Sequence, residues 1–290
     1  MKRIVLPTDF SDEAAKALPI AAQLARQFGA ELHLVHVLAP LLPAYTPRFH
    51  DAGADFRQAL GEIEQLFDEW QLKDCLHSLT VRTHVLTGVD PADLLSDRRF
   101  AQADLLVVAS TGASGLKELV IGSNAERLIR RATMPVLVLK NPPAYLSVKN
   151  VVFAADFQDY YDNSMERLQT LLDGFDYPTV HLLFVNTPSR FVPTHEIRPR
   201  MEAFMARYHL SGCTLNQQAE FDVETGLLAF AQEKNADLIV LGTHGRRGLR
   251  HLLQGSLAED VANHAPFPVL TLPLQSEHAP MVILDGVLLG

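Results

Sequence analysis

Ile4-Val5-Leu6-Pro7-Thr8-Asp9-Phe10 is the stretch that decides the fold, because a second version of it, Val151-Val152-Phe153-Ala154-Ala155-Asp156-Phe157, follows 147 residues later. Two more pairs of similar blocks keep the same order along the chain, each pair 133 residues apart. They are residues 103–108 with 236–241, and residues 135–137 with 268–270. Several matched blocks in one order indicate a duplicated domain.

The length of the chain agrees with a duplication, since 290 residues are enough for two domains of ordinary size. We expect one domain over residues 1–140 and a second over residues 149–274. Residues 275–290 form an apolar tail outside the repeat. We expect this tail to be docked, either as an added strand or over a partner surface, because an exposed apolar tail favours aggregation.

The two halves differ in length between their second and fourth strands. Residues 32–37 match residues 180–185 at an offset of 148, against 133 for the later blocks, so the first half carries about 15 more residues. Most of them fall around residues 41–56, where Pro40, Pro43, Pro47 and Gly53 interrupt regular structure. The extra segment is either a flexible flap or a longer surface connection, which loops tolerate at little cost.

Short apolar runs alternate with segments of helical spacing in both halves. The expected strands are residues 3–8, 31–38, 78–86, 104–110 and 135–139, then 150–155, 179–186, 214–221, 237–242 and 268–272. The expected helices are residues 12–28, 55–71, 91–102 and 123–132, then 159–174, 195–208, 225–235 and 256–264. This alternation predicts an α/β fold of two tandem doubly wound parallel sheets, each with five strands. Ligands bind such sheets beyond the carboxyl ends of the strands, which directs attention to the first, second and fourth strand of each half.

The strongest motif follows the fourth strand of the second half. It reads Gly242-Thr243-His244-Gly245, then nine residues, then Gly255-Ser256. Glycines let the backbone approach an anion closely, and the free N–H groups at a helix start attract phosphate. Arg246, Arg247 and Arg250 add positive charge around this loop. Ser256 and Glu259 also fit a helix capping box, and capping can coexist with phosphate binding.

The first half has a partial copy of this loop. Gly112 and Gly122-Ser123 keep the nine-residue spacing, but Ala109 replaces the first glycine and only Lys117 supplies charge. Asp9 and Asp156 follow the first strand of each half, and each is either a helix cap or a ligand contact. His244 either contacts phosphate or a partner, or is solvated.

Composition excludes several classes of protein. The net charge of −9 disfavours nucleic-acid binding, which needs a concentrated basic surface. The 2 cysteines cannot build a disulfide scaffold or a cysteine-rich metal site. No apolar run is long enough for a signal peptide or a membrane span, so we expect a soluble cytoplasmic protein without membrane contact. The P-loop, Rossmann and hydrolase-elbow motifs are absent, as is the zinc-protease motif.

Three segments together resemble the universal stress protein family: residues 4–11, residues 116–123 with 135–138, and the loop over 242–256. The similarity spans both halves, as in a tandem, two-domain member. The resemblance implies a sheet order of 3-2-1-4-5. It also implies that adenosine lies between the first-strand aspartate and the end of the second strand, with the ATP phosphates in the glycine loop and Mg²⁺ beside them.

Carried over residue by residue, the resemblance implies these ATP-binding positions. In the first half they are Asp9, Val37, Gly112, Gly122 and Ser123, and in the second Asp156, Val185, Gly242, Gly245, Gly255 and Ser256, to which we add His244 and Arg246 of the same loop. Ala109 departs from the family pattern near the ribose. No residue is assigned a catalytic role, and none is assigned as a metal ligand.

The leading functional hypothesis is a cytoplasmic stress-response regulator or sensor that binds ATP and signals its occupancy to other proteins, which are unidentified. The alternatives are a slow ATPase and a structural interaction protein without nucleotide. We expect the two halves to pack as an intramolecular pseudo-dimer, and two chains could pair further as a homodimer. The last strand of each half is a sheet edge in the family order, and exposed edges tend to be paired, so these strands are the candidate contact surfaces.

Overall fold

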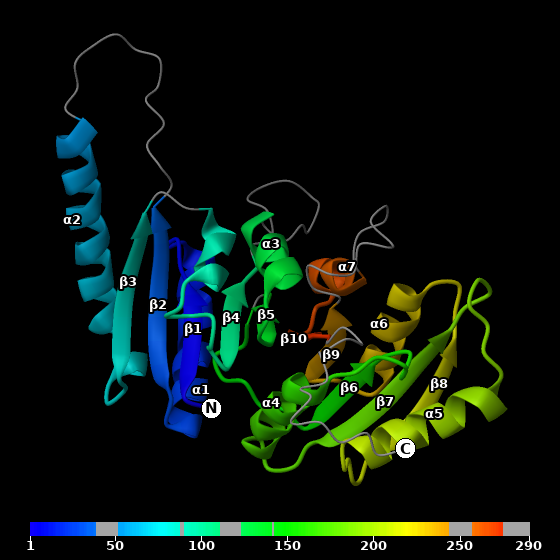
Figure 1. Ribbon diagram of the computed structural model, residues 1–290. Coiled ribbons are helices and arrows are strands. Elements are labelled where there is room, and N and C mark those ends of the chain that lie inside the picture. The colour runs from blue at the N-terminus through cyan, green and yellow to red at the C-terminus, as the bar shows by residue number, and fades with distance from the viewer. Residues whose placement is uncertain (39–51, 88–89, 111–122, 141, 244–256, 275–290) are drawn as a thin grey trace, which may run out of the picture.

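The computed structural model describes residues 1–38, 52–87, 90–110, 123–140, 142–243 and 257–274 (Figure 1). The first half contains β1 (Arg3–Pro7), α1 (Asp12–Phe28), β2 (Glu31–Leu38), α2 (Ala52–Gln71), η1 (Asp74–Leu76), β3 (Val81–Thr87), η2 (Pro91–Ser96), β4 (Leu105–Ala109), α3 (Ser123–Arg131) and β5 (Val136–Leu139). The second contains β6 (Asn150–Ala154), α4 (Asp162–Asp173), β7 (Thr179–Asn186), α5 (Thr194–Arg207), β8 (Thr214–Ala219), α6 (Val223–Glu233), β9 (Leu238–Thr243), α7 (Leu257–His264) and β10 (Val269–Pro273).

The ten strands form one sheet in the order β3-β2-β1-β4-β5-β10-β9-β6-β7-β8. Each half therefore has the expected 3-2-1-4-5 order with parallel neighbours. The expectation of two separate sheets needs refinement, because β5 and β10 pair antiparallel and join the halves through Leu137↔Leu270 and its neighbours. These are the two edge strands that were expected to make contacts. Because β5 and β10 pair with each other, neither is left as an exposed edge strand, and exposed edge strands are prone to pair with other chains.

Helices cover both faces of the joined sheet (Figure 1). On one face α1, α2, α4 and α5 pack a core that includes Leu18, Phe67 and Phe204. On the other face η2, α3, α6 and α7 pack a second core that includes Leu94 and Leu227. Because both faces are buried, the inner strands are almost continuously apolar, which is the pattern seen in the sequence.

Ionic and polar contacts also cross the boundary between the halves. Arg130 of α3 makes a bidentate ion pair with the buried Glu259 of α7, at 2.9 and 2.6 Å. In the repeat, Arg130 corresponds to position 263 and Glu259 corresponds to Glu126. Position 263 is an asparagine, so the ion pair is not repeated. Lys140 instead donates to the carbonyl of Asn263 at 2.5 Å. The boundary is thus pseudo-symmetric in its strands and asymmetric in its charges.

Two local differences from the expected elements have identifiable causes. A helix was expected over residues 91–102, but η2 is a six-residue 3₁₀ helix that ends at Ser96. The Asp97 carboxylate accepts from the Arg99 backbone N–H at 2.9 Å, and such a local bond competes with helix continuation. The extra length of the first half lies partly in α2, which has 20 residues against 14 in α5. The rest of that insertion, and the tail over 275–290, lie outside the described residues.

Candidate functional site

The strand registers place the candidate residues of each half side by side at the carboxyl edge of the sheet. Pro7 pairs with Val35, and Val5 pairs with Leu106. Continued past the strand ends, these registers put Asp9 level with Val37 on one side and with Ser110 on the other. In the second half the same continuation puts Asp156 level with Val185 and with Thr243.

The aspartate of each half organises a tight turn after its strand. Asp9 Oδ1 accepts from the Ser11 backbone N–H, and Asp156 Oδ1 accepts from that of Gln158, both at 3.0 Å. The intervening Phe10 and Phe157 both have φ of 60°, a left-handed conformation that a phenylalanine rarely adopts. A structural role is therefore established for both aspartates, and this role leaves the second carboxylate oxygen available to a ligand.

Aromatic side chains build the first-half site beneath this turn. The Phe10 ring stacks on His36 with centroids 5.2 Å apart and meets Phe67 and Trp70 edge-on. His36 Nδ1–H donates to the Thr8 carbonyl at 2.8 Å, since a carbonyl can only accept. These contacts fix the ends of β1 and β2 relative to each other beside Val37.

Ser110 is a site residue that the sequence did not single out. It follows β4 directly and is 2% exposed, and its hydroxyl has no hydrogen-bond partner among the residues that the structure describes. Its counterpart Thr243 is also buried, but the Thr243 hydroxyl donates to the Leu272 carbonyl at 3.3 Å. A buried hydroxyl without a partner costs about 1–3 kcal/mol, so its presence needs a reason.

In the second half, side chains fill the space beside the end of β9 more closely than at the corresponding place in the first half. A Cβ atom on Gly242 would lie 2.5 Å from the Tyr161 hydroxyl and 3.1 Å from Leu274 Cδ2. Close packing of Tyr161 therefore requires glycine at position 242. Val185 is 8% exposed. A Cβ atom on Gly226 of α6 would lie 2.6 Å from Val185 Cγ1, so the two residues are closely packed.

Much of both glycine loops lies outside the described residues. This applies to Gly112 and Gly122 of the first half and to His244, Gly245, Arg246, Gly255 and Ser256 of the second. Ser123 is described as the first residue of α3. The structure therefore places Asp9, Val37, Asp156, Val185 and Gly242 at the sheet edge, and the remaining assignments stay predictions.

The helix after the first glycine loop is tied to its surroundings by arginines. Arg127 of α3 pairs with Asp90 at 2.8 Å, and Arg131 pairs with Asp93 at 3.0 Å. Asp90 and Asp93 form the capping box at the start of η2. Together with the Arg130–Glu259 pair, these bonds connect the helix after the first loop both to η2 and to α7 of the other half.

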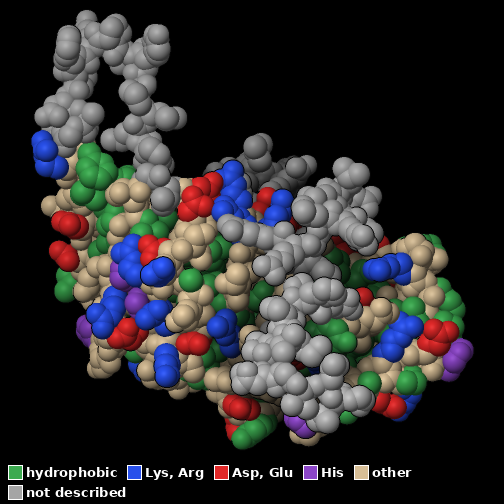
Figure 2. All heavy atoms as spheres, in the orientation of Figure 1, with side chains coloured by type: hydrophobic (Ala, Val, Ile, Leu, Met, Phe, Trp, Pro, Cys, Tyr) green, Lys and Arg blue, Asp and Glu red, His purple; other side chains and the backbone are tan. Residues whose placement is uncertain are grey.

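A charged cluster lies away from this edge, over β2 and β3, where blue, red and purple side chains gather in Figure 2. His33 Nε2–H donates to the Glu31 carboxylate at 3.3 Å, and His33 Nδ1 lies 2.9 Å from His84 Nε2. Burial, with the charges of His33 and Arg99, lowers the pKa of His84 to about 4. The hydrogen bond from Arg82 lowers the pKa of Glu31 to about 2. Burial also lowers the pKa of His33. Both histidines are therefore neutral at pH 7, and His84 Nε2–H can donate to His33 Nδ1 as in an ordinary structural pair.

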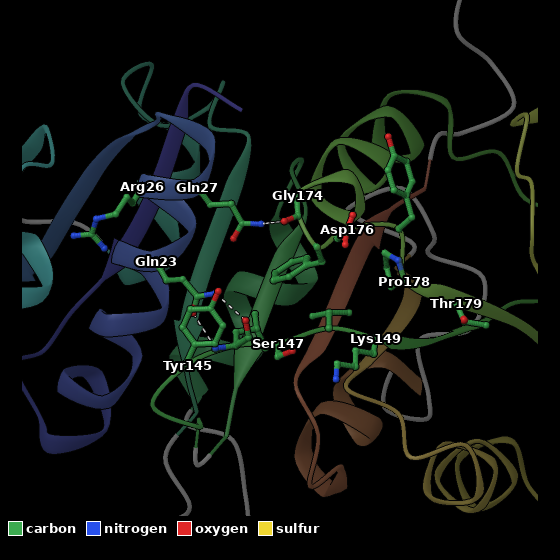
Figure 3. Close-up of a pocket in the computed structure, with 14 residues that line it drawn as sticks. Gln23, Arg26, Gln27, Tyr145, Ser147, Lys149, Gly174, Asp176, Pro178 and Thr179 are labelled. Atoms are coloured by element: carbon green, nitrogen blue, oxygen red, sulfur yellow. Dashed lines mark hydrogen bonds between the residues drawn. The ribbon is translucent and has the colours of Figure 1, made fainter.

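A pocket of about 670 Å³ lies between the halves, at the opposite edge of the sheet (Figure 3). It is lined by the last turns of α1, the junction around Tyr145 and Lys149, and the turn before β7. Gln23 exchanges two hydrogen bonds with the Leu146 backbone, and Gln27 donates to the Gly174 carbonyl. These bonds hold the halves together, and the pocket has no connection to the predicted nucleotide site.

Within the described residues, no group of three His, Cys, Asp or Glu side chains could hold a metal ion. Across the same part of the chain, no helix is long and apolar enough to cross a membrane.

Comparisons with known proteins follow the same division into halves. The family model of the universal stress protein family matches residues 1–140 and 217–273. A universal stress protein of Mycolicibacterium smegmatis is 24% identical over 298 residues, which cover 93% of this chain and 96% of that protein. Universal stress protein MJ0531 of Methanocaldococcus jannaschii is 33% identical over 151 residues, 49% of this chain and 83% of the relative. The crystal structure of a universal stress protein from Archaeoglobus fulgidus has a TM-score of 0.72 at 20% identity, covering 93% of this chain and 98% of that one, and so supports the fold.

Proposed function

The chain belongs to the universal stress protein family, in its tandem two-domain form, and from that premise we propose that its first half binds an adenine nucleotide, ATP with Mg²⁺, and that occupancy regulates contacts with other proteins. Universal stress proteins include adenine-nucleotide binders, since one solved member is a complex with cAMP. The choice of the first half rests on the residues of this chain.

The observation that carries the proposal is the buried Ser110 hydroxyl, which has no partner within the described part of the chain and lies level with Asp9 at the carboxyl edge. A hydroxyl next to a bound nucleotide can bond ribose or phosphate oxygens and recover the cost of its desolvation. The neighbouring Asp9 carboxylate is exposed and can accept from ribose hydroxyls. Val37 lies on the other side of Asp9, where the backbone at the end of β2 can meet the adenine.

Magnesium ion fits this arrangement without a dedicated protein cage. Mg²⁺ keeps several waters and is usually held by substrate phosphates with one or two carboxylates. Asp9 lies level with Ser110 at the carboxyl edge by register, so it could supply one oxygen directly or through water. The ion would neutralise phosphate charge in a protein that is itself acidic.

The regulatory part of the proposal rests on α3. This helix begins directly after the first glycine loop, and its arginines reach both η2 and Glu259 of the second half. A nucleotide that repositions the start of α3 would therefore bias contacts on both sides of the boundary between the halves. Such coupling is measurable as a change in hydrogen exchange of α7 when ATP is added.

Calorimetric titration with ATP and Mg²⁺ tests the binding, with two matched variants. Asp9→Ala removes a ligand contact together with a turn bond, and we expect at least about a tenfold loss of affinity. Asp156→Ala removes the same turn bond in the second half, so affinity should stay within about twofold. Equal effects of the two variants, or no saturable binding by the parent chain, would refute the proposal.

A further inference from the structure

Tyr161 fills the space beside Gly242, near the carboxyl end of β9. It stands at the start of α4, where its side chain makes no capping bond. Instead its ring crosses to the end of the sheet, and its hydroxyl lies 2.5 Å from where a Cβ of Gly242 would be. The glycine that begins the strongest sequence motif is therefore covered by a side chain of the same domain.

This position of Tyr161 is held by several packing contacts. The side chain is 2% exposed and meets Phe153 and Phe204 edge-on, with centroids 5.5 and 5.8 Å apart. The Tyr161 backbone N–H donates to the Tyr208 hydroxyl at 2.7 Å. Burial, with the negative charges of Asp159 and Asp156 nearby, raises the pKa of Tyr161 far above its usual range, so the phenol stays neutral.

The first half has a short side chain at the corresponding position. Ala14 of α1 precedes Tyr161 by 147 residues, the offset of the repeat at this point, and it is 3% exposed. An alanine cannot reach across the sheet edge as a tyrosine does, so position 109 tolerates an alanine where position 242 requires glycine. This difference in packing explains the alanine at position 109.

We propose that Tyr161 determines which half takes nucleotide: it closes the second half by filling the space over Gly242, so that each chain holds one nucleotide, in the first half. This inference rests on the proposed function. A ribose could enter the second half only if the Tyr161 ring left its aromatic neighbours. The burial of a large side chain is worth roughly a factor of 10 to 100 in an equilibrium constant, so the closed half should bind that much more weakly.

Native mass spectrometry with ATP and Mg²⁺ counts the nucleotides on each intact chain and tests the proposal. We expect one nucleotide on the parent chain and two on Tyr161→Ala. Tyr161→Phe keeps the ring over Gly242 and serves as the matched control, which should hold one. Two nucleotides on the parent chain, or the same number on the parent chain and on Tyr161→Ala, would overturn the role of Tyr161.

The same counts separate this inference from the proposed function. If the parent chain holds none and Tyr161→Ala holds one, the first-half function fails while the role of Tyr161 stands. If the parent chain and Tyr161→Ala each hold one nucleotide, the first-half function stands, but Tyr161 does not determine which half binds nucleotide. If neither binds, both proposals are refuted.

A reciprocal variant keeps the test decisive if Tyr161→Ala fails to fold. Ala14→Tyr places the same bulky side chain at the position in α1 that corresponds to Tyr161, and we expect it to weaken ATP binding by at least about tenfold. Ala14→Ser adds little bulk, so it should bind as the parent chain does. Unchanged binding by Ala14→Tyr would contradict the proposal.

Discussion

Replacement of Ser110 by alanine gives two effects of opposite sign, which together test the first-half site. The hydroxyl is buried, and no described residue offers it a hydrogen bond, so the folded chain without ligand carries its desolvation cost. Removing the oxygen removes that cost. The same change also removes a group that the proposed nucleotide would bond.

The structure sets the size of each effect. An unsatisfied buried hydroxyl costs about 1–3 kcal/mol, so Ser110→Ala should raise the free energy of unfolding by at least about 1 kcal/mol. One hydrogen bond contributes about 0.5–1.5 kcal/mol net, so ATP affinity should fall by roughly 2- to 13-fold. A more stable chain that binds its ligand more weakly is the expected signature.

Urea denaturation and calorimetric titration measure the two quantities, with Ser164→Ala as a control. Ser164 is buried to a similar degree, but its hydroxyl donates to the Pro273 carbonyl at 2.7 Å. Its removal should lower the free energy of unfolding by about 1 kcal/mol. If Ser110→Ala destabilises the chain as much as Ser164→Ala, the Ser110 hydroxyl is satisfied and the argument from it is wrong.

Three further predictions concern packing and charge. Gly242→Ala should destabilise the chain by about 1–3 kcal/mol in thermal denaturation, and Tyr161→Phe in the same chain should recover part of the loss; a neutral Gly242→Ala would disprove the close contact. Arg130→Met removes the bidentate partner of the buried Glu259 carboxylate and should cost about 1–3 kcal/mol in urea, whereas loss of an exposed i,i+4 pair should cost under about 0.5 kcal/mol. His84 has a pKa of about 4 in the folded chain and 6.5 in the unfolded chain, so the unfolded state binds more protons between these two pH values. The free energy of unfolding should therefore fall as pH falls from 6.5 to about 4. His84→Gln should flatten this dependence on pH, and an unchanged dependence would show that His84 is not its cause.

Much of the fold could be predicted because its determinants are local or repeated. The runs at β2 and β7 have the bounds read from the sequence, Glu31–Leu38 and Thr179–Asn186, since buried parallel strands are continuously apolar. The α1 helix begins after Ser11 and ends at Gly29, which has φ of 60° as a helix-ending glycine should. The joining of the halves through β5 and β10 agreed with the expectation that sheet edges are paired.

The features that decide between the two sites could not be predicted in the same way. Tyr161 and Gly242 are 81 residues apart, and no local pattern places one side chain over the other. The glycine motif indicated the better site in the second half, but packing of Tyr161 is a second physical reason for glycine there. Ser110 lies between Ala109 and Gly112 of the partial glycine motif, yet only the burial of its hydroxyl, with no partner among the described residues, makes it distinctive.

A crystal structure of the chain grown with ATP and Mg²⁺ tests the central claim most directly. The account predicts one nucleotide per chain at the carboxyl ends of β1 and β2, with the Asp9 carboxylate and the Ser110 hydroxyl within hydrogen-bonding distance of it and Tyr161 still over Gly242. A nucleotide at the ends of β6 and β9, with the first half empty, would contradict it.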